Sequence, residues 1–416
     1  MVEPRRGIWW FVFVMLPAYP ALVLTAEWYV DPSVSARYEF DDNRFLRDDS
    51  QSASTWKFSP FLVFGRRTPN TELTGTARVE VNESNREELD TTNAFFALLP
   101  VYRTERSVWR LNASYRRDTT LRTSILEPAF DPLVLTGEVV PVEGEAPVGE
   151  PLPVPEVPIS DDIGLRREEI ERNVVRIAPE WRRELFPRLD LGLRYSYTDT
   201  FYSDAEQSNV VDSQRHLGTA DLSYRLSEVD DLGVVTSFQN FQNDQDSDFD
   251  AYGLQLGLQH RFSETLRGIV TAGPEYTDRS SGDSDLSFAF GFGVDKRFEE
   301  SNLGVFFRRG VAPSEAGNAL QTNELNIRWF GDISPRLSFS FLARAFRNEG
   351  AGDSQVGADE RYYAQVEPTL SYELTENIFV DLGYRFRWQD SDDVNATGNA
   401  AQLAVGYRLD RFSLSR

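Results

Sequence analysis

Residues 366–388, VEPTLSYELTENIFVDLGYRFRW, contain two alternating segments joined by a short polar turn. In the second segment every second residue from Ile378 to Trp388 is apolar or aromatic, whereas most of the residues between them are charged or small. Side chains on a β-strand alternate between the two faces of the sheet, so such a strand has one apolar face and one polar face. The stretch therefore predicts an antiparallel hairpin whose two faces meet different surroundings.

The same unit recurs along the chain from Trp28 onward. Each unit is roughly 9 to 13 residues long, which is the length a tilted strand needs to cross a bilayer. The pattern predicts about eighteen strands, an even number as in single-chain bacterial barrels. The expected strands cover residues 28–40, 53–65, 71–82, 92–103, 107–118, 170–182, 188–201, 214–227, 231–241, 250–262, 265–277, 284–298, 302–309, 319–330, 335–347, 360–374, 377–389 and 399–412.

Short and long connections alternate between these segments. RLSEVDDL (225–232) and RFSETL (261–266) are short, whereas DDNRFLRDDSQSAS (41–54) and WQDSDDVNATGNA (388–400) are long and polar. Outer-membrane barrels have short periplasmic turns and longer external loops, and a soluble sandwich has no reason to sort its connections in this way. With an even number of strands, both termini are expected on the periplasmic side.

Tyrosine and tryptophan concentrate near the ends of the apolar faces. Two packed soluble sheets would instead bury mainly aliphatic residues between them. Aromatic girdles at both interfaces are typical of a membrane barrel, and only a closed sheet leaves no unpaired edge in hydrocarbon. The predicted fold class is therefore all-β, a transmembrane antiparallel up-and-down β-barrel of about 18 strands, with roughly 16 to 18 as the range. The girdle residues are Trp56, Trp109, Trp181, Tyr197, Tyr224, Tyr252, Tyr276, Trp329, Tyr372, Trp388 and Tyr407.

Composition excludes several classes of protein. The chain has 416 residues, no cysteine and a formal net charge of -23. Without cysteine there is no disulfide framework and no thiolate metal site. Nucleic acid is excluded as a partner, because its phosphates are bound by lysine and arginine. No stretch after the N-terminus is apolar for long enough to form a spanning helix, so a helical membrane protein is excluded too.

Residues 1–26 have the pattern of a secretory signal peptide. Arg5 and Arg6 form a basic start, residues 8–16 form an apolar core, and Ala26 ends the segment with a small side chain. A single anchoring helix is the alternative, but two prolines interrupt the apolar stretch and no basic cluster follows it. We therefore expect an exported chain whose mature part, residues 27–416, is the barrel.

A proline- and glutamate-rich insert occupies residues 119–169, which include VVPVEGEAPVGEPLPVPEVP. Such a run cannot join a β-ladder. By strand parity it lies on the external side, where three roles are open: a solvated loop, a constriction folded into the lumen, or a segment that docks a partner. If it folds into the mouth, deletion of residues 138–158 should raise conductance and reduce cation preference.

The polar face of the strands supplies the predicted lumen. Its residues are charged or amide-bearing, and a barrel of about eighteen strands is wide enough to hold water. The wall therefore fits an aqueous path whose selectivity depends on its charges. A plugged barrel in which the charges only pair with one another is the alternative. The candidate lumen residues are Arg194, Arg225, Gln255, Gln259, Arg308, Arg328, Arg344, Glu367, Asp381, Arg385, Arg387 and Arg408.

Neither a metal site nor a catalytic site is expected, and no cofactor is implied. The aspartate-rich segment NDQDSDFD (243–250) fails as a calcium loop, because Phe249 stands where glycine is needed and Gln255 where a bidentate glutamate is needed. The two histidines, His216 and His260, fall on or near the apolar face close to strand ends. The sequence contains none of the common hydrolase or phosphate-binding motifs. We therefore expect no enzyme.

The start of the expected barrel, WYVDPSVSARYEFDDNRFL (28–46), resembles the first strand of the outer-membrane proteins known as β-barrel porin 2. The shared feature is a Pro-Ser-containing strand that leads into a Y-x-x-D-N element, here Tyr38 to Asn43 with one extra residue. The likeness continues in later hairpins such as 178–200 and 366–387. The chain differs from most such barrels in ending YRLDRFSLSR, where Phe412 is followed by four more residues. Related barrels accompany exopolysaccharide and exosortase systems, so the resemblance implies passage or surface assembly of polysaccharide.

The sequence thus predicts a porin-like conduit of the bacterial outer membrane, or the outer-membrane component of a polysaccharide export system. A plugged structural or surface-binding barrel, and a soluble exported carbohydrate-binding β protein, are the alternatives. The expected partners are outer-membrane lipid and lipopolysaccharide, the barrel assembly machinery, and polysaccharide or export-system proteins.

Overall fold

The structure is a computed structural model that describes residues 26–119, 170–203, 210–245, 247–280, 282, 284–314, 318–350, 360–391 and 394–415. The expected signal peptide lies outside these residues except for Ala26, and the insert lies outside them after Thr119. Both therefore remain predictions. In the described parts of the chain, no helix is long and apolar enough to cross a membrane.

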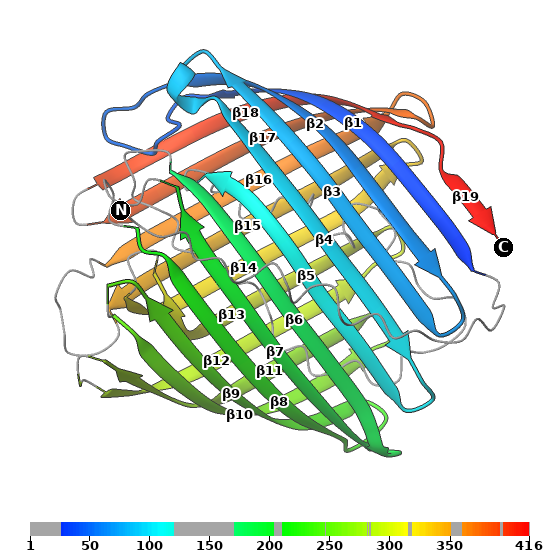
Figure 1. Cartoon of the computed structure of the whole chain (residues 1–416), viewed down its shortest axis with the longest axis vertical. Coiled ribbons are helices and arrows are strands. Elements are labelled where there is room, and N and C mark those ends of the chain that lie inside the picture. Colours follow the sequence, from blue (N-terminus) through cyan, green and yellow to red (C-terminus); the bar gives the residue numbers. More distant parts are fainter. Residues whose placement is uncertain are drawn as a thin grey trace, which may run out of the picture.

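Eighteen antiparallel strands, β1 to β18, form one closed barrel (Figure 1). Each strand pairs with its neighbours in the sequence, and the ladder between β1 and β18 from Ser33–Arg408 to Asp41–Ala400 closes the sheet. The predicted fold class is confirmed. The elements are β1 (Glu27–Asp41), β2 (Ala53–Arg67), β3 (Thr71–Ser84), the 3-10 helix η1 (Glu87–Leu89), β4 (Thr91–Arg103), β5 (Ser107–Thr119), β6 (Glu171–Phe186), β7 (Leu189–Tyr202), β8 (Ser213–Arg225), β9 (Asp230–Asn243), β10 (Phe249–Ser263), β11 (Leu266–Arg279), β12 (Ser284–Arg297), β13 (Ser301–Pro313), β14 (Ala319–Ser334), β15 (Leu337–Gly350), β16 (Arg361–Glu373), β17 (Ile378–Ser391), β18 (Val394–Arg408) and β19 (Phe412–Ser415).

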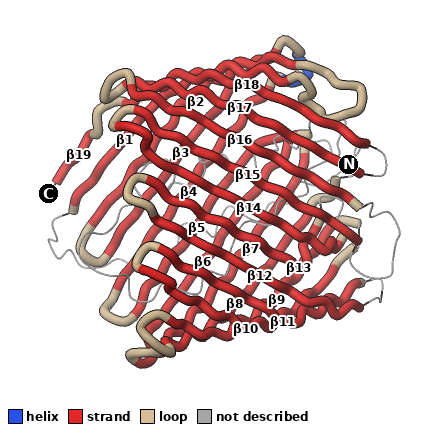
Figure 2. The backbone as a smooth tube through the Cα atoms, turned by 180° about the vertical axis from the view of Figure 1, so that it is seen from behind, coloured by secondary structure: helices blue, strands red, loops and turns tan. Residues whose placement is uncertain are grey.

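Alternation along each strand separates an apolar outside from a polar inside. On β10, Leu254, Leu256 and Leu258 are exposed, whereas Ala251 and Gln259 are buried. An exposed apolar band around a closed sheet is the surface that hydrocarbon requires, because neighbouring strands satisfy one another's backbone hydrogen bonds over most of their length. The strands run obliquely across the barrel, as Figure 2 shows from behind. The barrel is therefore of the type that bacterial outer membranes contain.

The connections differ between the two ends of the barrel. At the end where Glu27 pairs with Ser415, the turns are tight, for example residues 187–188 and 264–265. The other end carries longer connections, including residues 42–52. By the usual arrangement of such barrels, the first end faces the periplasm and the second the outside.

The last strand differs from its expected range, 399–412, at both ends. β18 begins at Val394, and β17 and β18 form a hairpin in which Ser391 pairs with Val394, so the long loop expected at 388–400 is wrong. β18 ends at Arg408, and β19 resumes the same edge with Phe412 opposite Val30 of β1. The interruption has the form of a β-bulge, because residues 409–411 lie opposite only two residues of β1.

Small side chains explain why the start of β18 was missed. Ala396, Gly398 and Ala400 face inward, where the sequence pattern leads one to expect larger polar groups. The connection 42–52 folds over them, and a Cβ on Gly398 would lie only 3.2 Å from Leu46 Cδ1. The inner face of β18 has small residues because the connection 42–52 packs on it. The strand therefore lacks the strong alternation of apolar and polar residues that the other strands have.

The external halves of β12 and β13 are not joined. Their ladder runs only from Phe290–Arg309 to Arg297–Asn302 in the described residues. β11 nevertheless follows β12 as far as Ser284, and β14 follows β13 as far as Pro313. We call this unpaired boundary, between residues 284–289 of β12 and 310–313 of β13, the seam.

Candidate functional site

The lumen has two unlike halves. The half formed by β4 to β13 encloses a cavity of about 420 Å³. The half formed by β14 to β18 and β1 to β3 contains several buried ion pairs. Buried ion pairs also lie on β5 to β8, so the cavity and not the pairing of charges distinguishes the first half.

Arginine dominates the charged lining of the cavity. Among the described lining residues, Glu275 on β11 is the only carboxylate. The rest of the lining is formed by hydroxyl, amide and apolar side chains. The cavity thus has an excess of positive charge although the whole chain has a net charge of -23. The lining arginines are Arg116, Arg176, Arg215, Arg308 and Arg309.

Neutral groups orient two of these arginines. Arg215 on β8 donates from Nε and Nη2 to Gln239 Oε1 on β9, at 3.1 and 2.6 Å. Arg176 on β6 donates from Nε to Ser196 Oγ on β7, at 3.2 Å. Each of these hydrogen bonds helps to fix the direction of its guanidinium.

Carboxylates lie near two others. Arg116 Nε lies 3.2 Å from Asp118 Oδ2. Arg308 Nη2 lies 3.8 Å from Glu324 Oε2, but Glu324 also contacts Arg344 Nε at 2.6 Å. Arg308 also interacts electrostatically with Glu275, so two carboxylates lie near these two arginines.

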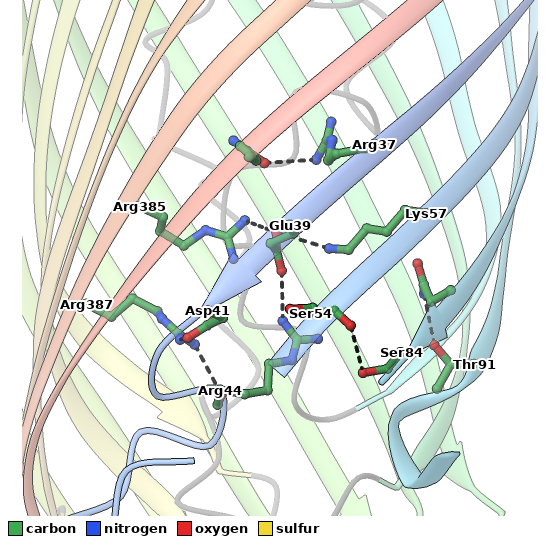
Figure 3. A network of polar contacts seen from close by, with 12 residues as sticks. Arg37, Glu39, Asp41, Arg44, Ser54, Lys57, Ser84, Thr91, Arg385 and Arg387 are labelled. Carbon is green, nitrogen blue, oxygen red and sulfur yellow. Dashed lines mark hydrogen bonds and ion pairs between the residues drawn. The ribbon is translucent and has the colours of Figure 1, made fainter. Parts of the chain in front are cut away.

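The opposite half of the lumen is built around Glu39 on β1 (Figure 3). Its carboxylate lies 3.2 Å from Lys57 Nζ and 3.3 Å from both Arg44 and Arg385. Next to it, Arg387 contacts Asp41 at 2.6 Å. Buried charges of this kind are stable only when they are paired and hydrogen-bonded. The charges on this side of the lumen are therefore paired with one another.

The connection 42–52 is attached to this network. Asn43 donates from Nδ2 to the carbonyls of Thr397 and Arg47, at 2.9 and 2.7 Å. Asp42 accepts two hydrogen bonds from Asn399, one from its backbone N–H and one from its amide. The D-N pair that carried the family resemblance therefore fastens the first external connection to β18.

The residues predicted to line the lumen fall into three groups. Gln255 and Arg308 line the cavity. Arg225, Gln259, Arg328 and Asp381 occupy other positions on the polar phase of their strands. Alternation identified polar wall positions but did not tell which of them border open space. The residues that form ion pairs with the described chain, besides Arg308, are Arg194, Arg344, Glu367, Arg385, Arg387 and Arg408.

Strand alternation places Arg116, Arg176 and Arg308 on the polar face, but the other three charged residues of the cavity were not singled out from the sequence. Arg215 has the same odd phase on β8 as Arg225, and Glu275 directly precedes the girdle residue Tyr276, so strand phase could have found both. Arg309 lies on the apolar phase of β13 and is exposed. Its place in the cavity follows from the break between β12 and β13, for which alternation gives no signal.

The histidines and the aspartate-rich segment have ordinary partners. His216 Nδ1 lies 2.6 Å from the Tyr195 hydroxyl, and His260 Nδ1 lies 2.7 Å from Asp230 Oδ1. In the segment 243–250, Asp248 accepts the backbone N–H of Asn243. Over the described part of the chain, no group of three potential ligands could hold a metal ion.

No protein-family model and no curated protein matches the sequence. Among solved structures, OccK5 (OpdH) of Pseudomonas aeruginosa is 12% identical, with 92% of this chain and 98% of that chain covered and a TM-score of 0.48. OccAB3 of Acinetobacter baumannii is 10% identical, with 92% and 99% covered and a TM-score of 0.45. OprD of Pseudomonas aeruginosa is 10% identical, with 91% and 95% covered and a TM-score of 0.42. At such identities and scores these similarities carry no functional inference, so the function is derived from the lumen itself.

Proposed function

We propose that the chain is a porin-like conduit of the bacterial outer membrane that favours small anionic solutes. The observation that carries this proposal is the cavity lining, in which five arginines face one glutamate among the described residues. Rings of charged side chains set the selectivity of a pore, and a cleft lined by one sign of charge concentrates ions of the opposite sign.

Removal of two lining charges tests the selectivity. Two unit charges about 8 Å apart in water interact by roughly 0.5 kcal/mol, which is about a twofold change in partition for each charge. Because the partition of chloride falls while that of potassium rises, each charge changes their ratio about fourfold. The double variant Arg176→Gln/Arg215→Gln should therefore lower the chloride-to-potassium permeability ratio about sixteenfold at low salt, where screening is weak. The measurement is the reversal potential of the purified barrel in a planar bilayer under a KCl gradient.

Arg225→Gln is the matched control, because it removes the same charge from the polar face of β8 outside the cavity. It should leave the ratio within the experimental error. The double variant and the control are both compared with the parent chain, so the charges that neither variant changes contribute equally to the permeability ratio in each comparison. A barrel that gives no steady channels would favour the plugged alternative, and equal effects of the variants would refute the selectivity.

We propose, secondly, that the barrel serves polysaccharide export or surface assembly, with lipopolysaccharide, the assembly machinery and export proteins as partners. The support is the resemblance of residues 28–46 and the mixture of phenylalanine rings and hydroxyl groups in the cavity lining. Swelling of proteoliposomes in sugars of equal size distinguishes the substrates. A uronic acid should enter faster than a neutral hexose, and equal rates would contradict a preference for acidic sugars.

A further inference from the structure

Near their external ends, β13 and β14 depart from the barrel wall toward the lumen, as Val311 and Ala319 show. Val311 on β13 and Ala319 on β14 pack with Phe241, Phe249 and Ala251 in one buried cluster. The last three belong to the inner face of β9 and β10. A hairpin that stayed in the wall next to β12 would not reach that face.

A hydrogen bond fixes this displacement. The backbone N–H of Val311 donates to Glu275 Oε2 on β11, at 3.0 Å. In an unbroken ladder Phe288 of β12 would lie opposite Val311, because Phe290 lies opposite Arg309. The carboxylate of β11 thus takes up a donor that would otherwise face β12.

The external part of β12 is left without β13 as its neighbour. Leu286 is 71% exposed, the highest value among the exposed large apolar side chains, and Phe288 is 56% exposed. Leu286 pairs with Tyr276, whose ring lies 6.5 Å from that of Tyr252, so the seam begins at the external aromatic girdle. The rings of Phe290 and Phe307, 6.1 Å apart, lie at the end of the seam that is nearer the periplasm.

The lumen cavity reaches this seam. Phe290 and Arg309, the last pair of the β12–β13 ladder, both line the cavity. An open sheet edge at membrane depth is tolerated only where it is buried in protein or lines a water-filled cavity. The open edge at the seam meets the second of these conditions, because its last ladder pair lines the lumen cavity.

We propose that the seam between β12 and β13 is a lateral opening that admits the acyl chain of an anionic amphiphile from the external leaflet into the lumen. Leu286, Phe288 and Phe290 supply an apolar rim for the chain. Arg309, exposed at the same seam, supplies the charge that binds the anionic head. This inference does not depend on the proposed anion selectivity, because it concerns access through the wall and not conduction along the axis.

Paired cysteines test whether the wall is open, and the chain has no cysteine of its own. The variant Phe288→Cys/Val311→Cys should not form a disulfide on mild oxidation, because the two positions are opposite one another only in an unbroken ladder. The variant Phe292→Cys/Phe307→Cys is the control, because it has the same register on the same two strands and lies within the ladder. The control should cross-link, and equally efficient cross-linking of both pairs would overturn the proposal.

Lipid access is tested with a fluorophore on the inner face of the wall. Ser287→Cys and Ser237→Cys, each labelled with bimane, place one probe on the inner face of β12 at the seam and the other on the inner face of β9, away from the seam. Vesicles of brominated phosphatidylglycerol should quench the probe at position 287 at least threefold more than at position 237. Equal quenching at both positions, or none at either, would overturn the proposal even if a cysteine pair failed to fold.

The charge of the head and the source of the chain are separated by further arms of the same experiment. Arg309→Gln should reduce quenching by brominated phosphatidylglycerol and leave quenching by brominated phosphatidylcholine unchanged. Free brominated stearate, added to vesicles without bromine, distinguishes a fatty acid from a membrane phospholipid. Quenching in either arm supports the opening, whereas an Arg309→Gln variant quenched as strongly as the parent would refute the role of that arginine.

Discussion

At the scale of single residues, the buried charges stabilise the barrel only as a set. Glu39 is 2% exposed and contacts Lys57, Arg44 and Arg385. Arg385 also contacts Glu367 at 3.0 Å. Removal of one partner from such a buried pair leaves an uncompensated charge, which costs far more than the net contribution of the intact pair.

Arg385→Met should therefore lower the free energy of unfolding by about 3 to 5 kcal/mol. The guanidinium is lost while Glu39 and Glu367 stay in the wall. The measurement is the urea midpoint of the barrel in lipid vesicles, followed by tryptophan fluorescence. Arg408→Met is the control, since its pair with Glu373 is about half exposed and should contribute at most about 1 kcal/mol. Equal shifts of the two midpoints would show that the network does not act as a buried set.

The sequence could predict the face of these residues but not their partners. Alternation places Glu39 and Arg385 on the polar side of their strands. Their contact joins residues 346 positions apart, across the β1–β18 ladder that closes the barrel. It depends on the register between β1, β18 and β17, which no local pattern specifies. For the same reason Arg308 could be placed in the wall while its sharing of Glu324 with Arg344 could not be foreseen.

At the scale of elements, the first external connection illustrates how a polar loop becomes part of the wall. Asn43 binds Thr397 and Arg47 through its side chain, and its carbonyl oxygen accepts a hydrogen bond from Arg387. Leu46 packs against Phe346 and Tyr363 on β15 and β16. The connection is therefore held by both hydrogen bonds and apolar contacts over the small residues of β18.

Asn43→Ala should release this connection without unfolding the barrel. Loss of buried side-chain hydrogen bonds costs about 1 to 3 kcal/mol locally. Trypsin added from the external side should then cut after Arg44 and Arg47 at least fivefold faster than in the parent. Asn85→Ala in the next external connection is the control, because it removes an exposed hydrogen bond to the Ser54 N–H. Unchanged cleavage in the Asn43 variant would mean that the apolar contacts alone hold the connection.

The same comparison shows which elements a sequence pattern can delimit. β10 and β17 contact lipid on one side and polar groups on the other, and their expected ranges agree with the structure within two residues. The strand expected at 302–309 continues to Pro313, and alternation ceases where the ladder to β12 ends. Alternation of apolar and polar residues arises where a strand separates lipid from water. It therefore does not predict the bounds of a strand that leaves the wall or whose inner face is covered by another segment.

At the scale of the whole molecule, the sheet separates lipid from the lumen everywhere except at the seam between the external halves of β12 and β13. This arrangement explains how a chain with a net charge of -23 presents an apolar exterior, because most of its charged strand residues, with Arg309 as an exception, are directed inward or lie near the ends. It also explains why mean composition gave no membrane signal. Half of each strand is polar, so a membrane barrel has a much weaker hydrophobic pattern in each segment than a spanning helix.

Neighbouring residues on one strand should therefore meet opposite solvents. Leu256 on β10 is 63% exposed on the apolar face, whereas Gln255 lines the cavity. A fluorophore on Leu256→Cys should be quenched strongly by a lipid-soluble nitroxide and weakly by iodide, and a fluorophore on Gln255→Cys should show the reverse. The two positions lie at nearly the same height, so depth in the bilayer cannot account for a difference between them. If the lipid-soluble quencher reached both sites equally, the barrel would not separate the two solvents, and the conduit proposed for its lumen would have no wall.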